Sequence, residues 1–140
     1  MMNTKLYKRV LNLAGDLVHA AQRKDQKKFD ALYNELKVLC TENDNTDKDH
    51  PVQWETLADF TDEFSDAITL YEKALAKASA INAKDYMSSI GYSLATMHVE
   101  LDQQAEAILA LEKAKISANK IADKELKAEI DDLLTDLKAQ

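Results

Sequence analysis

The sequence predicts an all-α fold in which antiparallel helical hairpins stack one on the next. The first observation is a stretch that occurs twice: residues 66–75 read DAITLYEKAL, and residues 106–115, 40 positions later, read EAILALEKAK. An offset of this length fits one helical hairpin that buries its apolar face against a repeated neighbour. The second observation is that the 140 residues include only two glycines and one proline. This scarcity of helix breakers favours helix almost throughout the chain.

Length and composition indicate one domain, residues 1–140, with a mass of 15.7 kDa. Hydrophobic residues make up 46% and charged residues 31%, a balance typical of a folded globular protein. No apolar run approaches the ~18 residues that cross a bilayer. The single cysteine, Cys40, excludes an internal disulfide framework, and its place in an apolar row predicts a buried thiol. We therefore expect a cytoplasmic protein with no membrane partner.

The charge is unevenly placed along the chain. Residues 1–40 carry a net charge of +4, and residues 41–140 carry −11, for a total of −7. A nucleic-acid partner is not expected, because phosphate neutralisation requires a dominant basic face. The charges either solvate the helix surfaces or attract an oppositely charged partner, which includes the basic end of a second copy.

Residues 1–40 are predicted to form an N-terminal helical hairpin. Apolar residues follow helical spacing over residues 4–21 and again over 29–40, and the polar segment 22–28 makes the turn. Gly15 lies inside the first of these helices, where we expect it to permit a close approach of a neighbouring helix. Residues 41–50, TENDNTDKDH, are predicted to be a loop because Asn and Asp favour turns. Their alternation resembles that of calcium ligands, but Lys48 stands where a calcium loop needs glycine, so no calcium site is expected.

Two further helix pairs are predicted over residues 51–121. Pro51 suits the first turn of a helix, and the expected helices run from Pro51 to about Phe60 and from Phe64 to about Asn82. The helices of the second pair are expected from about Ala83 to Leu101 and from the turn at 102–104 to about Ile121. A seventh helix, within residues 122–140, has an apolar stripe opposite a charged side, as expected of a helix that caps the end of a stack.

Residues 51–121 resemble the tetratricopeptide repeat, a family of helix pairs in which small and large residues alternate at fixed positions. Ala107 and Ala114 match the two small positions of the second helix, and Ala67 and Ala74 match them 40 residues earlier. The large positions are matched by Trp54, Tyr71 and Leu94. The period of 40 exceeds the usual ~34 of the family, because the helices are longer. The resemblance implies a short right-handed solenoid whose neighbouring helices approach at the alanines.

The resemblance also implies a function in protein–protein interaction, because the first helices of each pair line a concave groove that holds a peptide or helix of a partner. The family's groove positions fall here on Val52, Thr56, Asp59, Ser89, Tyr92, Thr96 and Val99. The positions with which some family members clamp a terminal carboxylate are occupied by Val52 and Tyr92. We therefore predict an adaptor or small chaperone-like protein without that clamp.

Catalysis is not predicted. His19, His50 and His98 are scattered over a helix face, a loop and an expected core row, and none has a second ligand at metal spacing. We therefore expect no enzyme activity, metal or cofactor. Two other interpretations stay open: a self-assembling structural module that forms a homodimer through its unlike charges, and an acidic inhibitory or immunity-type protein that covers a basic partner.

Overall fold

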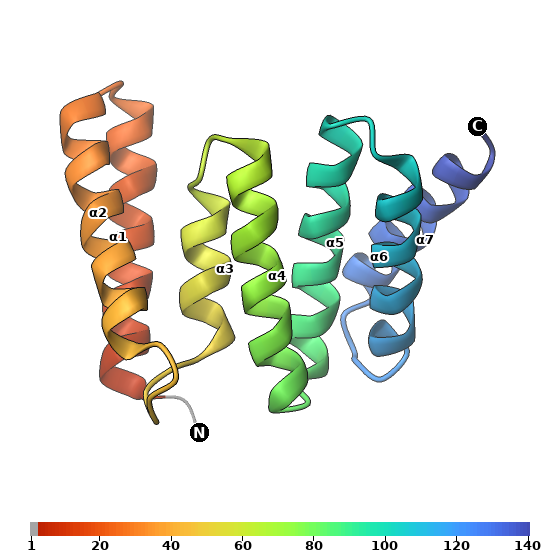
Figure 1. The fold of residues 1–140 in the computed structure, drawn as a ribbon, viewed down its shortest axis with the longest axis horizontal. Coiled ribbons are helices and arrows are strands. Elements are labelled where there is room, and N and C mark those ends of the chain that lie inside the picture. The colour runs from red at the N-terminus through yellow and green to blue at the C-terminus, as the bar shows by residue number, and fades with distance from the viewer. Residues whose placement is uncertain (1–2) are drawn as a thin grey trace.

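The structure is a computed structural model that describes residues 3–140. Those residues form seven α-helices and no strand, as the sequence predicts (Figure 1). The helices are α1 (Thr4–Gln22), α2 (Gln26–Asn43), α3 (Pro51–Asp59), α4 (Phe64–Ala80), α5 (Lys84–Glu100), α6 (Gln104–Ala118) and α7 (Lys124–Lys138). None of the helices in residues 3–140 has the length and apolar character needed to cross a membrane.

Side-chain caps and left-handed turn residues set the ends of several helices. The Asn3, Asp25 and Asp123 side chains each accept a hydrogen bond from a backbone N–H in the first turn of α1, α2 and α7, at 3.0, 3.1 and 3.0 Å. Such caps satisfy donors that have no partner within the helix. Three of the short connections contain a residue at positive φ, namely Lys24, Asn82 and Asp102. Asn82, expected to stop the fourth helix, has a φ of 53° and follows the end of α4.

The helices lie side by side in chain order, as Figure 1 shows. Each packs on the next, and α1 also contacts α3, α3 contacts α5, and α5 contacts α7. In contrast, no Cα atoms of α2 and α4, or of α4 and α6, come within 8 Å of one another. The odd-numbered helices therefore form a continuous layer, whereas the even-numbered helices stand apart on the other side.

Two groups of buried side chains form the core, and they meet on α5. The first joins α1 to α5 and includes Leu94, and the second joins α5, α6 and α7 and includes the adjacent residue Ala95. The duplicated alanines lie at the helix contacts, where Ala67, Ala74 and Ala107 have no exposed surface. Small residues at these places let the helix axes approach closely.

The close approach expected at Gly15 is wrong, because a Cβ added there would meet no atom within 4 Å. Gly15 lies on an exposed face of α1. The glycine that serves this purpose is Gly91 on α5, where an added Cβ would lie 2.9 Å from the Cβ of Ala114 on α6. The α5–α6 contact thus depends on the absence of a side chain at residue 91.

The loop is shorter than predicted, because α2 continues to Asn43, where the Asn43 side-chain amide donates to the Leu39 carbonyl at 2.8 Å. The remaining loop is tied to α4. Lys77 donates to Asp44 at 2.8 Å and also to Asp49. Lys73 donates to Asp44 at 2.6 Å and lies 4.1 Å from the centroid of the Trp54 ring.

Trp54, on α3, also holds the loop, because its indole N–H donates to Asp49 at 2.9 Å.

Cys40 is fully buried, as predicted, and its thiol donates to the Gln53 carbonyl at 3.3 Å. Burial raises the pKa of Cys40 to about 12, so the thiol stays protonated and unreactive. His50 accepts a hydrogen bond from the Val52 N–H at 3.1 Å and caps α3.

Candidate binding surface

The seven residues predicted to line a groove come from two helices of the odd-numbered layer, α3 and α5. Five of them are partly buried: Val52, Thr56, Ser89, Tyr92 and Thr96. The other two, Asp59 and Val99, are exposed. The two helices are joined here by the Ser89 hydroxyl, which donates to the Glu55 carboxyl at 2.9 Å. We refer to these seven residues together with Glu55 as the α3–α5 face.

Two carboxyl groups give the α3–α5 face its electrostatic character. Burial of the Glu55 side chain raises its pKa to about 7, and the hydrogen bond from Ser89 opposes this shift. Asp59 is exposed as a residue, but its carboxyl group is partly buried, and this burial raises its pKa. Asp59 also accepts a hydrogen bond from the Tyr71 hydroxyl at 2.5 Å. Carboxyl groups that are hard to ionise and yet reach solvent are suited to a partner that brings a positive charge or hydrogen-bond donors.

Tyr92 is less available than a free aromatic anchor would be. It is partly buried against the core group of α6 and α7. Burial raises the pKa of its hydroxyl, and the negative charge of Glu129 on α7 raises it further. The last helix therefore shields part of this side chain, which leaves Val99 as the most exposed apolar residue of the α3–α5 face, with 38% of its surface exposed.

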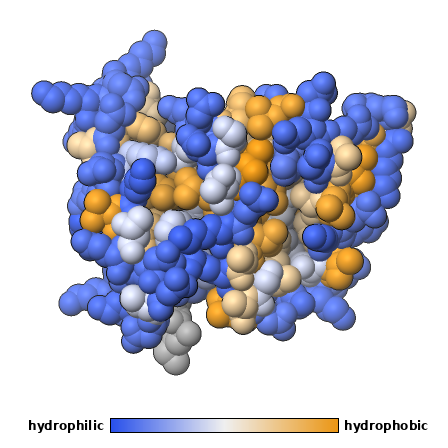
Figure 2. Space-filling view, viewed as in Figure 1, coloured by the Kyte–Doolittle hydropathy of each residue, from blue (hydrophilic) through white to orange (hydrophobic). Residues whose placement is uncertain are grey.

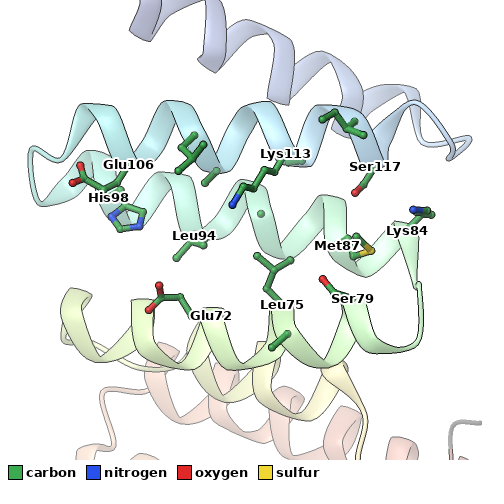
Figure 3. Close-up of a pocket in the computed structure, with 16 residues that line it drawn as sticks. Glu72, Leu75, Ser79, Lys84, Met87, Leu94, His98, Glu106, Lys113 and Ser117 are labelled. Carbon is green, nitrogen blue, oxygen red and sulfur yellow. The ribbon is translucent and has the colours of Figure 1, made fainter.

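A second surface lies on the opposite side, where α4 and α6 stand apart above α5. It is a groove of about 710 Å³, which we call the α4–α6 groove (Figure 3). Its floor includes Met87, Gly91 and Leu94 of α5. Apolar residues of both walls face it, namely Leu75 of α4 and Leu109 and Ile116 of α6. In the space-filling view, hydrophobic side chains gather over α5 and along α6 on this side (Figure 2).

Charged residues of opposite sign flank this groove. Figure 3 shows Glu72, Glu106 and His98 at one end and Lys84 at the other, with Lys113 between them. His98 was predicted to belong to the core, but it is only partly buried, and its ring nitrogen lies 2.7 Å from the Gln103 side-chain oxygen. It lies in the last turn of α5, where the chain turns toward α6 and leaves one side of the ring open.

Sequence reasoning missed the α4–α6 groove, although the repeat contained a signal for it. Leu109 replaces Thr69 of the first copy, and Ile116, which directly follows the second copy, stands where Ala76 follows the first. Both of these apolar residues are exposed, at 56% and 69%. Exposed apolar residues in place of a polar and a small one indicate a surface that the first copy lacks.

Among residues 3–140, no group of three or more His, Cys, Asp or Glu side chains is placed to hold a metal ion. Comparison with protein families, with curated proteins and with solved structures gives no match to this chain in any of the three.

Proposed function

We propose that this protein is an interaction module, an adaptor or small chaperone-like protein, that holds a peptide or helix of a partner protein against the α3–α5 face. The fold would be a short solenoid of the tetratricopeptide type with α7 as its cap, and no catalytic step is required of it. The observation that carries the proposal is the Glu55–Ser89 hydrogen bond. It joins two helices whose predicted groove residues all reach solvent.

The chemistry of the face supports a partner segment with a basic side chain. Glu55 and Asp59 lie one helical turn apart on α3, and both have raised pKa values. A lysine or arginine placed between them would stabilise their charged forms and recover part of the cost of their burial. Val99 would contact an apolar side chain of the same segment, since an exposed aliphatic residue at the edge of a polar face is a common point of contact.

A paired set of arginine substitutions tests the proposal. Val99→Arg places a bulky positive charge on the α3–α5 face, and Val38→Arg places the same charge on α2, where valine has a similar exposed fraction, 42% against 38%. Each protein is used as bait for partners from the source cells, after its melting temperature has been compared with that of the wild type. Partners of the α3–α5 face should be lost by the Val99→Arg protein and kept by the Val38→Arg protein.

Retention of every partner by both variants would exclude the α3–α5 face as the binding surface. Tyr92→Ala is a less suitable probe, because Tyr92 packs against the α6–α7 core and its truncation would also destabilise the fold. A Glu55→Gln, Asp59→Asn double variant then separates the roles of charge and shape. It should bind a basic partner less tightly while its fold is kept.

A further inference from the structure

We propose that the α4–α6 groove is the contact surface between two copies of this chain, with α6 of each copy lying antiparallel against α6 of the other. The inference does not depend on the function proposed for the α3–α5 face, which lies on the opposite layer. It rests on the pattern of α6, on the balance of charge in the groove and on its length.

The groove side of α6 has the spacing of a helix that pairs with another helix. Glu106, Leu109, Lys113 and Ile116 are separated by three, four and three positions, and all four line the groove. This is the a/d spacing by which two helices interlock their side chains. Leu109 and Ile116 are 56% and 69% exposed, and Ile116 is the most exposed large hydrophobic residue of residues 3–140.

The charges on this stripe are complementary to themselves. When two copies of α6 run antiparallel about a two-fold axis that passes beside Leu109, Glu106 of one copy comes opposite Lys113 of the second copy, and the second pair forms by symmetry. The apolar Leu109 lies between these pairs, near the axis. Like charges would oppose such a contact, whereas the order Glu, Leu, Lys, Ile brings opposite charges together.

Comparison of the two copies of the repeat shows that Lys113 lacks a carboxylate partner. Its counterpart on α4, Lys73, pairs with Asp44, the residue that follows α2. No carboxylate lies within 4 Å of the Lys113 amine among residues 3–140. A carboxylate brought by an occupant of the groove can therefore pair with the exposed Lys113 amine, and Glu106 of a second copy brings one.

The dimensions and net charge of the groove also fit a second copy. Its lining extends on α5 from Lys84 to His98, a distance of about 21 Å along a helix. With 15 residues, α6 has nearly the same length, about 22 Å. The protein as a whole carries −7, but the groove has two acidic residues, Glu72 and Glu106, and two lysines, Lys84 and Lys113. Two copies can therefore meet here without the repulsion expected elsewhere on the surface.

Charge-reversed variants test this interface. Sedimentation velocity of the wild-type protein at up to about 100 µM should show a monomer–dimer equilibrium. Glu106→Lys and Lys113→Glu should each weaken the dimer at least about tenfold, because each places like charges opposite one another at both symmetric contacts. An equimolar mixture of the two variants should recover the dimer, since every contact in the mixed species joins opposite charges.

The control is Glu112→Lys, which changes the net charge as Glu106→Lys does, but at an exposed position of α6 outside the groove lining. Its dimer should be as tight as that of the wild type. All substituted residues are exposed, so melting temperatures close to that of the wild type are expected and are measured for each variant.

Three outcomes would overturn the proposal. The first is a wild-type protein that stays monomeric over the whole concentration range. The second is a dimer that the single variants do not weaken, or that Glu112→Lys weakens equally. The third is a dimer that high salt abolishes but the α6 variants leave intact, which would place the contact between the basic residues 1–40 and the acidic remainder of the chain.

Discussion

The Cβ atom that an alanine would add at Gly91 lies 2.9 Å from the Cβ atom of Ala114, inside the normal contact distance of two methyl groups. The Cβ atom of Ala114 cannot rotate away, because it is bonded directly to the backbone, and the α carbon of Ala114 is only 3.6 Å away. Relief of the overlap therefore requires the α5 and α6 backbones to move apart.

Gly91→Ala should lower the free energy of unfolding by about 1–2 kcal/mol, because overpacking outweighs the gain in helix propensity. Gly15→Ala is the matched control, since the added methyl group has free space there. It should raise the free energy of unfolding by roughly 0.5–1 kcal/mol. Urea unfolding measures both, and stabilisation by both substitutions would contradict the close contact of α5 with α6.

Ala67→Leu and Ala107→Leu should each destabilise the protein by ~1–3 kcal/mol, because both alanines are fully buried between helices. Ala105→Leu, at an exposed position of α6, makes the same change of volume without overpacking. Thermal unfolding distinguishes them. A wild-type melting temperature in both buried variants would disprove the close helix packing at the repeated alanines.

Lys77→Met should destabilise the protein by about 2–3 kcal/mol, because it leaves the Asp49 carboxylate, only 9% exposed, without its ionic partner. Lys73→Met should cost about 1 kcal/mol or less, since the Lys73 side chain is 42% exposed. Trp54, the only tryptophan, lies beside both lysines and reports unfolding through its fluorescence. Equal effects of the two substitutions would show that burial does not distinguish these ion pairs.

Glu55 should make the protein less stable as the pH rises from about 4.5 to about 7, because its pKa is raised from 4.5 to about 7 in the folded state. In that range the folded state binds more protons than the unfolded state, so the free energy of unfolding falls with pH. The full shift corresponds to ~3 kcal/mol, and partial exposure of the side chain reduces the effect to on the order of 1 kcal/mol.

The Glu55→Gln protein should therefore be more stable than the wild type at pH 8, with little difference at pH 4. Urea unfolding at the two pH values measures this change, and Glu100→Gln, at an exposed position of α5, is the control. His50 has a lowered pKa because of burial and acts in the opposite sense, but it is present in every protein compared. A difference of the same size at both pH values would disprove the assigned role of Glu55.

The repeat made the helices and their contacts predictable. Its alanines indicated which side of α4 and of α6 is buried, and Ala67 and Ala107 are indeed fully buried. Helix ends could be placed because Pro51 and Asn82 act through local backbone geometry. A periodic pattern contains this information, since it reports burial along one helix at a time.

Relationships between distant residues were not predictable in the same way. The ion pair of Lys77 with Asp44 joins positions 33 apart in the sequence, and both residues lie outside the stretch that is repeated. The choice between Gly15 and Gly91 likewise depended on which helix face meets a neighbour. For the candidate surfaces, the repeat offset located Val52, Tyr92 and Val99 on α3 and α5, but the residues that surround them come from other helices.

The place of α5 between the two core groups has a consequence for how the protein opens. Leu94 packs in one group and Ala95 in the other, so α5 can be released only when both are disrupted. Amide protons of α5 should therefore exchange with solvent only through global unfolding, whereas those of α1 and α7 can exchange through partial opening at either end. Native-state hydrogen exchange should show slowest exchange in the middle of the chain, with protection that decreases toward both termini.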